Sequence, residues 1–581
     1  MNAYTGTIVT RIRFLLILAM FLVGILIWRM CNLQIAQHNY YLGLAFGQQR
    51  FDKAQMAQRG KLLVHDSMSE DSVYYPLAFD VKTYAIWVVP KNVKNKDNVA
   101  TILADSTGIS KDEIFGKINN DKLYIPPIKR GLKYDEANVI SDKKISGVFV
   151  MPEYSRYFPE GSLASQDLGF VNSTGDGKYG LEGYYNSELK GKDGSIQGEQ
   201  DTLGRVINLL QQNDPQDGVS YVLTLDRSVQ YYVEKKLKEA IEKYQAESGT
   251  VVVMDIQTGG IVAMANSPDF DPNNYRDQAQ NDQSLFANPA ISSVFEPGSI
   301  FKTITMAAAI DQGVVTPETE GVFDATVKVG NHTISTAEGK AFGKETMTQV
   351  LQNSDNVAMV WLSEKMGNDM MYKYLKSFGF LDKTGIDLDT ESNSIVQPLK
   401  QWKDITRATL SFGQGVSVTP IQMVAAYAAI ANNGKYIYPH IVDKIIMPDG
   451  TEKKIEKKEG EQVLKESVAA QVRDMLRSVV ELGHSKLAAV PGFNVGAKTG
   501  TAQIPNPDGT GYEDSPDKLG IYNHSLAGFA PTDKPRYALL VKLTKPKTAK
   551  YAESTAAPLF GDISSFLLNY YYREKPTKPI N

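Results

Sequence analysis

The longest apolar run of the chain lies near its N-terminus. Residues 14–28 carry no charge, and basic residues bound them on both sides. With those basic side chains reaching toward the lipid surface, the run approaches the roughly 17–25 residues that a membrane-spanning helix needs. Arg11 and Arg13 favour a cytoplasmic N-terminus, and no Ala-x-Ala-like cleavage site follows the run. The pattern predicts a cytoplasmic tail over residues 1–13 and an anchor over residues 14–30 that is retained, rather than a cleavable signal peptide. The rest of the chain is then expected outside the membrane.

Between the anchor and about residue 219, short apolar segments alternate with polar and glycine-rich stretches. Residues 61–64 and 84–89 have the composition of strands, and residues 134–140 have the spacing of an amphipathic helix. Residues 161–204 are rich in glycine. We therefore expect an elongated, sheet-rich pedestal domain over residues 31–219.

A different pattern begins near residue 220. Residues 249–255 and 260–265 are two strand-like runs around a Gln-Thr-Gly turn, which predicts a hairpin. Further elements are expected as helices over 228–244, 348–366, 420–432 and 558–570, and strands over 493–497, 525–530 and 538–543. Strands, then helices, then strands of one sheet predict an α+β domain over residues 220–572, with an antiparallel sheet and a buried helix cluster. A tail over residues 573–581 follows it.

The composition, with 42% hydrophobic and 22% charged residues among 581, is that of ordinary globular protein. The net charge of −4 gives no reason to expect nucleic acid as a partner. Cys31 is the single cysteine, so an intramolecular disulfide is excluded. The six histidines show no metal-ligand spacing, and we expect neither a metal nor a cofactor.

One short stretch combines an apolar helix with reactive side chains. Residues 303–310 are apolar on every face, which predicts a helix buried in the core, and Ser299 stands where that helix should begin. Lys302 lies almost one turn later on the same face, within reach of the serine hydroxyl. Partial desolvation would lower the pKa of this lysine and make it a proton acceptor for a nucleophilic serine.

The Ser-x-x-Lys pattern carries little information by itself, because it recurs at Ser141, Ser187 and Ser515. Those three serines lie in polar surroundings, where a solvated pair is the better explanation. Only Ser299 opens an apolar helix, so we expect the chemistry at that position.

Two further short motifs follow along the chain. Ser-Asp-Asn at residues 354–356 would, standing alone, most often be a helix cap or a turn. Lys-Thr-Gly-Thr at residues 498–501 belongs to a strand-like segment that could line a cleft. A second Lys-Thr-Gly at residues 383–385 follows a helix and a turn, which is typical of a surface loop. We therefore assign the cleft role to Lys498.

In this order, the three motifs resemble the set of penicillin-binding proteins and serine β-lactamases. The likeness extends along nearly the whole chain after the anchor, and the flanking motifs look like those of class B penicillin-binding proteins. They occur at residues 57–66, 156–164, 177–182, 223–226, 411–422 and 527–531. One departure is His-Asp-Ser-Met-Ser at residues 65–69, where the family usually has an Asp-Arg-Asn-Gly turn. It concerns the pedestal and not the chemistry.

The resemblance implies a transpeptidase fold and a peptidoglycan D,D-transpeptidase of the septal, division type, with the elongation type as the alternative. Ser299 would be acylated by the penultimate D-alanine of a stem peptide, and a neighbouring stem's amine would then form the cross-link. Lys302 would be the general base. Ser354 and Asn356 would relay a proton and bind the substrate amide. Lys498 would supply positive charge, and Thr499 and Thr501, with Gly500 between them, would bind the substrate carboxylate. The backbone N–H groups of Ser299 and Thr501 would form the oxyanion hole.

Two other readings use the same motifs. A membrane-anchored β-lactamase or penicillin sensor would share the site, but the pedestal segment has no purpose in a hydrolase. A non-catalytic division scaffold could keep the fold, but intact Ser299, Lys302 and Lys498 argue against it. The expected partners are stem peptides, β-lactams, the membrane, division proteins and a membrane glycan polymerase of the shape, elongation, division and sporulation family.

Overall fold

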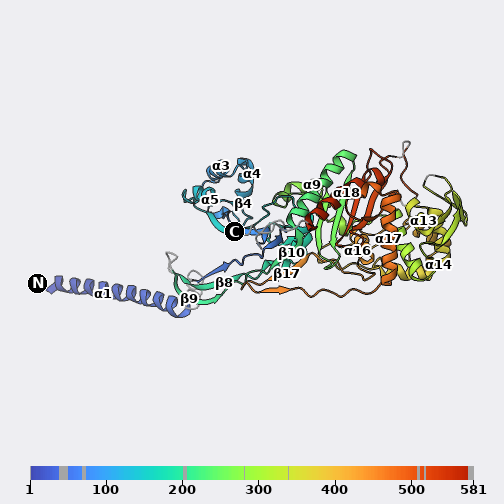
Figure 1. Ribbon diagram of the computed structural model, residues 1–581. Helices are drawn as coiled ribbons and strands as arrows, with labels where there is room; N and C mark the ends of the chain where they lie inside the picture. The colour runs from blue at the N-terminus through green and yellow to red at the C-terminus, as the bar shows by residue number, and fades with distance from the viewer. Residues whose placement is uncertain are drawn as a thin grey trace, which may run out of the picture. The chain divides into compact units, whose positions relative to one another are not determined.

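The computed structural model describes residues 2–37, 50–67, 73–200, 206–279, 282–337, 339–506, 511–515 and 519–572. The chain divides into two units (Figure 1). One holds Met1–Ala57 with Gly191–Asp217, and the other holds Gln58–Lys190 with Gly218–Asn581. The domain boundaries expected from the sequence stay predictions, and the expected tail lies outside the described residues.

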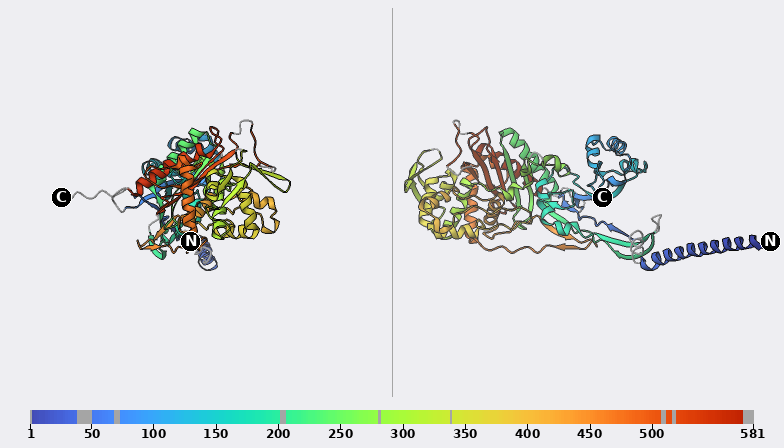
Figure 2. Two further views of the ribbon diagram at one scale, coloured as in Figure 1. Left: turned by 45° about the vertical axis from the view of Figure 1, so that its right-hand side comes forward. Right: turned by 180° about the vertical axis from the view of Figure 1, so that it is seen from behind.

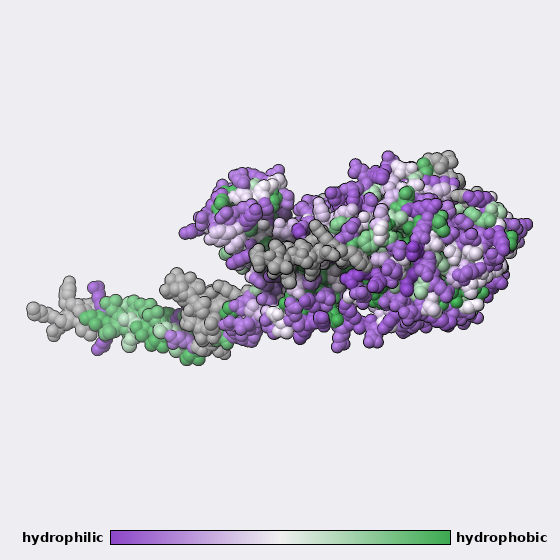
Figure 3. All heavy atoms as spheres, viewed as in Figure 1, coloured by the Kyte–Doolittle hydropathy of each residue, from purple (hydrophilic) through white to green (hydrophobic). Residues whose placement is uncertain are grey.

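The first unit contains the apolar N-terminal helix α1 (Asn2–Cys31), which a π-helical turn (Asn32–Ala36) continues. The segment Thr10–Ile35 contains an 18-residue window with a mean hydropathy of 2.5, and none of this window is buried (Figure 3). In the part of the chain that the structure describes, it is the one helix long and apolar enough to cross a membrane. The unit also holds an antiparallel sheet of β1 (Arg50–Gln55), β8 (Gly194–Gln200) and β9 (Val206–Asn213). The predicted N-terminal apolar helix is confirmed.

The second unit contains a mixed sheet in the order β18-β17-β10-β2-β3-β4, with β5 pairing to β3. Its strands are β2 (Leu62–His65), β3 (Tyr75–Val88), β4 (Lys129–Leu132), β5 (Val148–Tyr157), β10 (Ser220–Asp226), β17 (Val442–Ile446) and β18 (Glu452–Lys454). Helices α3 (Lys96–Thr107), α4 (Lys111–Ile118) and α5 (Tyr134–Ser141) bury their apolar faces with β3 and β4 in a separate small core. The predicted sheet-rich pedestal is thus present, and it includes strands that are distant in sequence.

Three charged residues of the pedestal motifs meet in one buried ion cluster. Glu182, which is fully buried, accepts from Arg59 Nε at 2.6 Å and from Arg156 Nε at 2.7 Å. Asp80 accepts from the Arg59 backbone N–H at 2.9 Å and from Arg156 at 3.3 Å. Buried charges are stable only when they are paired and hydrogen-bonded, so each of these charged side chains needs the others although they lie far apart in the sequence.

The second sheet of this unit is antiparallel, in the order β12-β11-β21-β20-β19. Its strands are β11 (Ser248–Asp255), β12 (Ile261–Ser267), β19 (Gly496–Gln503), β20 (Tyr522–Ala530) and β21 (Tyr537–Thr544). Helices α9 (Arg227–Tyr244) and α18 (Ala556–Tyr572) lie on one face of this sheet and α16 (Pro420–Ala431) on the other (Figures 1 and 2). Val251 and Val253 pack with α9 and α18, while Val252 and Met254 pack with α16. Side chains of period two thus bury both faces, and the predicted α+β transpeptidase-type fold is confirmed.

The remaining elements complete this unit. They are α6 (Ser165–Leu168), β6 (Phe170–Val171), β7 (Gly177–Lys178), α7 (Gly180–Tyr184), α8 (Asn186–Lys190), α10 (Tyr275–Ala279), α11 (Pro289–Ser292), α12 (Lys302–Asp311), β13 (Glu320–Phe323), β14 (Thr326–Val329), β15 (His332–Ser335), β16 (Gly343–Thr346), α13 (Met347–Asn353), α14 (Asn356–Ser377), α15 (Asp404–Leu410), α17 (Glu466–Leu482) and the short 3₁₀ turns η2 to η8.

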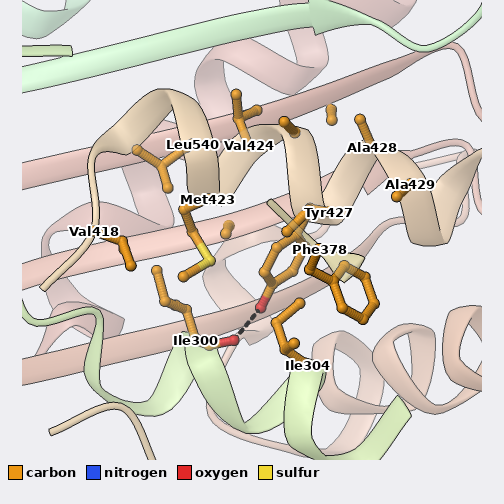
Figure 4. Close-up of a cluster of buried hydrophobic side chains, with 14 of the residues drawn as sticks. Ile300, Ile304, Phe378, Val418, Met423, Val424, Tyr427, Ala428, Ala429 and Leu540 are labelled. Carbon is orange, nitrogen blue, oxygen red and sulfur yellow. Dashed lines mark hydrogen bonds between the residues drawn. The ribbon is translucent and has the colours of Figure 1, made fainter. Parts of the chain in front are cut away.

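Helix α16 holds the start of α12 in place. Every residue of α16 is buried, and the Tyr427 hydroxyl donates to the Ile300 carbonyl at 2.8 Å (Figure 4). The same hydroxyl oxygen lies 2.9 Å from Thr303 Oγ1. One buried phenol therefore satisfies two polar groups where the backbone enters α12.

Tyr427→Phe should destabilise the protein by about 1–3 kcal/mol, because it leaves the Ile300 carbonyl and the Thr303 hydroxyl buried without this partner. Thermal denaturation of the detergent-solubilised protein measures the change. The matched control is Tyr231→Phe, at an exposed tyrosine of α9. Equal melting temperatures for the two variants would contradict the assigned role.

Candidate active site

The candidate site is a cleft of about 600 Å³ in the second unit. The parts of the chain that line it include the turn that carries Ser299, the turn at Ser354, the strand β19 and the hairpin of β14 and β15. The hairpin contributes residues 332–335. The motifs that the sequence singled out thus converge on one place.

Ser299 lies in a 3₁₀ turn, Gly298–Phe301, that leads directly into α12. All ten residues of α12 are buried, as the apolar pattern predicts, whereas Ser299 is half-buried and lines the cleft. The Gly298 N–H donates to the Gly413 carbonyl at 3.0 Å. Gly413 has a φ of +82°, and a Cβ there would lie 2.2 Å from the Gly298 carbonyl oxygen, so only glycine fits. The serine stands on a rigid backbone.

Ser354 marks a break between two helices. The sequence predicts one helix over residues 348–366, and this prediction is wrong: α13 ends at Asn353 and α14 starts at Asn356. Ser354 is left-handed, with a φ of 55°, and the Asp355 carboxylate caps α14 by accepting from the N–H groups of residues 357 and 358. The side-chain cap favours a new helix start over continuation. The break turns the Ser354 carbonyl and hydroxyl toward Lys302.

The Ser354 hydroxyl lies between two buried lysines. Lys302 Nζ donates to Ser354 O at 2.6 Å and to Ser354 Oγ at 3.1 Å, and Lys498 Nζ donates to the same Oγ at 3.0 Å. Both lysines are fully buried. The sequence predicted a contact of Lys302 with Ser299. Among the described residues, Lys302 Nζ instead forms its hydrogen bonds with Ser354.

Burial changes the protonation of both lysines. It lowers the pKa of Lys302 well below the usual value, the neighbouring charge of Lys498 lowers it further, and Asp355 opposes this. Burial also lowers the pKa of Lys498, to about 7, against an upward effect of Glu553. Two amines with lowered pKa values and a hydroxyl between them can pass a proton in either direction, so the arrangement suits acid–base chemistry.

The remaining predicted site residues take different positions. Thr499, Thr501 and Asn356 line the cleft, and the Asn356 amide donates to the Ser335 carbonyl at 2.9 Å, which ties α14 to the hairpin wall. Gly500 does not line the cleft: a Cβ there would lie 2.6 Å from Ser525 Oγ and 2.9 Å from the Pro297 carbonyl oxygen. Its lack of a side chain lets β19 approach the turn that carries the serine.

The second Lys-Thr-Gly triplet lies outside the cleft. The Thr384 N–H and hydroxyl both donate to the Glu391 carboxylate, at 2.7 and 2.6 Å, in a loop. This contact is structural, and it agrees with the assignment of the cleft role to Lys498.

Comparison with known proteins agrees with this geometry. A family model described as the penicillin-binding protein transpeptidase domain matches residues 249–565, which is more than half of the chain. The chain belongs to the penicillin-binding protein transpeptidase family. A second model, the penicillin-binding protein dimerisation domain, matches residues 55–223, the region of the predicted pedestal.

Relatives of this penicillin-binding protein are similar over most of their length. Stage V sporulation protein D of Bacillus subtilis is 35% identical, over 87% of this chain and 77% of the relative. Peptidoglycan D,D-transpeptidase FtsI of Escherichia coli K12 is 32% identical, over 85% of this chain and 81% of the relative. The crystal structure of penicillin-binding protein 3 from Mycobacterium tuberculosis with aztreonam has a TM-score of 0.69 at 28% identity, covering 89% of this chain and 97% of that one.

The structure adds a carboxyl pair beneath the site that the sequence did not indicate. Glu345 on β16 accepts from the Asn353 amide through one oxygen and faces the Asp355 carboxyl with the other. The side chains of both residues are almost fully buried, and Glu345 Oε2 and Asp355 Oδ2 have no hydrogen-bond donor. One shared proton satisfies both oxygens. Burial, followed by the charge of Asp355, raises the pKa of Glu345 to about 7.

A second unpredicted group lines the cleft next to Thr501 of this penicillin-binding protein. Lys550, Glu553 and His484 lie there, and His484 Nδ1 is 3.4 Å from Glu553 Oε2. They come from two segments, before β19 and after β21, so no local pattern in the sequence joins them.

Glu345→Gln should stabilise the protein at alkaline pH and leave it nearly unchanged at acidic pH. Burial holds the pKa of native Glu345 at about 7, whereas the unfolded residue loses its proton near the ordinary pKa of a glutamate, 4.5. Folding therefore takes up a proton between these values, and the native state loses stability as the pH rises through about 7. The amide cannot ionise and can donate to Asp355, so we expect a gain of about 1–2 kcal/mol at about pH 8.5 that vanishes near pH 5.

Melting temperatures at the two pH values measure this effect. Glu345→Ala is the control, because it leaves the Asp355 oxygen without a donor and should destabilise the protein at both values. A stability difference between Glu345→Gln and the native protein that does not vary with pH would refute the shared proton.

Proposed function

We propose that this protein is a serine-type peptidoglycan D,D-transpeptidase with Ser299 as the nucleophile. The observation that carries the proposal is the Ser354 hydroxyl between the buried amines of Lys302 and Lys498, beside half-buried Ser299 in the cleft. The names of relatives support the same activity, since the Escherichia coli protein is called a peptidoglycan D,D-transpeptidase.

In the first half-reaction, Ser299 Oγ attacks the carbonyl carbon of the penultimate D-alanine of a stem peptide. Lys302, whose lowered pKa favours the neutral amine, accepts the serine proton. The C–N bond then breaks, and the leaving amine of the terminal D-alanine takes a proton through the Ser354 hydroxyl. The backbone N–H groups of Ser299 and Thr501 are the proposed oxyanion hole, typically worth about 10²–10³ in rate.

In the second half-reaction, the amine of a neighbouring stem peptide attacks the acyl-enzyme. A new amide bond forms, the bond to Ser299 Oγ breaks, and a proton returns to that oxygen. The charge of Lys498 and the hydroxyls of Thr499 and Thr501 would hold the terminal carboxylate of the donor. Thr499 and Thr501 line the cleft, and Lys498 Nζ lies 3.0 Å from the hydroxyl of Ser354, which also lines it. Asn356, at the hairpin wall, would hold the substrate amide.

Fluorescent penicillin should label the full-length protein in detergent, and Ser299→Ala should abolish the label, by more than about a hundredfold, because acylation needs the hydroxyl. Ser187→Ala is the matched control, since Ser187 starts another Ser-x-x-Lys pattern on exposed α8. Labelling is followed by gel fluorescence over time. An adduct that decays within seconds would indicate a β-lactamase, and no adduct on the folded protein would indicate a scaffold.

We also propose a septal, division-type role at the cell membrane. The support is the similarity to the Escherichia coli protein FtsI and to penicillin-binding protein PbpB of Mycolicibacterium smegmatis, which is 33% identical over 85% of this chain. The apolar segment Thr10–Ile35 would anchor the protein, with Arg11 and Arg13 on the cytoplasmic side and the transpeptidase domain outside. A membrane glycan polymerase and division proteins would contact the anchor and the pedestal.

Depletion of the protein should stop septum formation while the lateral wall continues to grow. The full chain should restore septation, whereas a secreted form lacking residues 1–29 should still bind penicillin but not restore it, because it is not held at the membrane next to its partners. Microscopy of depleted cells measures this. Arrest of lateral growth would favour the elongation type, and full complementation by the secreted form would exclude a partner role for the anchor.

A further inference from the structure

Glu553 is the single carboxylate among the described residues that line the cleft. It lies in the short turn η8 (Ala552–Ser554), next to strand β19. The backbone N–H of Ala552 donates to Thr501 Oγ1 at 3.0 Å, so the turn is attached to the strand that would hold the donor's terminal carboxylate. The Glu553 side chain is paired with His484 and is still 41% exposed, so a ligand in the cleft can reach it.

The fold holds this turn in place. The His524 ring on β20 is buried, with Nδ1 2.8 Å from Thr555 Oγ1 and Nε2 3.1 Å from the Lys550 carbonyl oxygen. The carbonyl can only accept, so Nε2 carries the proton and the threonine hydroxyl donates to Nδ1. Burial lowers the pKa of His524 to about 4, so the ring stays neutral near pH 7 and keeps both bonds. Glu553 is therefore presented from a rigid support.

The transpeptidation reaction itself indicates which ligand comes close to Glu553. The acceptor nitrogen forms the same kind of amide bond that the leaving D-alanine nitrogen has just lost, so by microscopic reversibility it approaches through the space that D-alanine vacates. That space lies at the Thr499 and Thr501 end of the cleft, where Glu553 is. Before attack, a primary amine near pH 7 is mostly an ammonium ion, and a carboxylate is the group that attracts it.

We propose that Glu553 is the docking group for the acceptor amine, and that His484 beside it completes the site. This inference rests on the proposed transpeptidase function. Docking itself moves no proton. In the step that follows, the ammonium gives one proton to the Glu553–His484 pair, which passes it to solvent; the nitrogen bonds to the acyl carbon; and a second proton goes to Ser299 Oγ as the acyl C–O bond breaks.

The test is the partition of one acyl-enzyme between aminolysis and hydrolysis. The full-length protein in detergent is acylated with an N-acyl-D-alanyl thioester, and D-alanine or hydroxylamine is added as the acceptor. D-Alanine carries an ammonium group at pH 7, whereas hydroxylamine is mostly uncharged. Chromatography gives the ratio of transfer product to hydrolysis product, which is independent of how fast the acyl-enzyme forms.

Glu553→Gln should lower this ratio for D-alanine by about five- to tenfold relative to the ratio for hydroxylamine, because only the ammonium loses a charged partner. Glu481→Gln is the matched control: this carboxylate on α17 is paired with Arg477, is about as exposed as Glu553 and does not line the cleft. It should change neither ratio.

Each other outcome overturns the proposal. Equal losses for both acceptors would make Glu553 a structural residue or a base that acts on the attacking neutral amine, and unchanged ratios would remove it from the acceptor path. A native protein that is acylated at Ser299 but transfers to neither amine would instead overturn the transpeptidase function itself, and the docking role with it.

Discussion

The structure of the site depends on one requirement, that two buried lysines be held next to each other. Lys302 and Lys498 are fully buried, and removing an ammonium group from water is costly unless hydrogen-bond acceptors replace the water. Ser354 supplies two of those acceptors, its carbonyl and its hydroxyl. Since burial lowers the pKa of both amines, part of the cost is also avoided by loss of a proton.

This requirement explains the local backbone. A serine inside a continuous helix would commit its carbonyl to the helix, and only the left-handed turn at Ser354 frees that group for Lys302. The turn needs a cap for the next helix, which Asp355 provides, and the Asp355 carboxyl in turn needs Glu345 and a shared proton. On the other side of the cleft, Gly500 allows β19 to bring Lys498 close enough. A mobile backbone could not keep these groups aligned.

The sequence predicted those parts of the fold in which the pattern of side chains is local. The two apolar runs around the Gln-Thr-Gly turn predicted the hairpin of β11 and β12, and the apolar run after Ser299 predicted the buried α12. The break at Ser354 was missed because the apolar spacing continues through it, although Asp355 carries the signature of an N-cap. Glu345 and the pair of Glu553 and His484 were out of reach, because their roles depend on contacts between segments far apart in the sequence.

Charge is the property that makes one end of the cleft suitable for both halves of a transfer reaction. In the proposed mechanism the donor arrives with a carboxylate, which the charge of Lys498 and the hydroxyl of Thr501 would attract. The acceptor arrives as an ammonium, which a negative group would attract. A site with positive charge alone would bind the donor and repel the acceptor. Glu553 raises the pKa of Lys498 against the larger effect of burial and so favours its charged form, and the proposed docking role would use the same carboxylate to attract the acceptor. Water has no net charge, so neither Lys498 nor Glu553 would attract it in this way. The proposed arrangement would therefore favour transfer to an amine over hydrolysis.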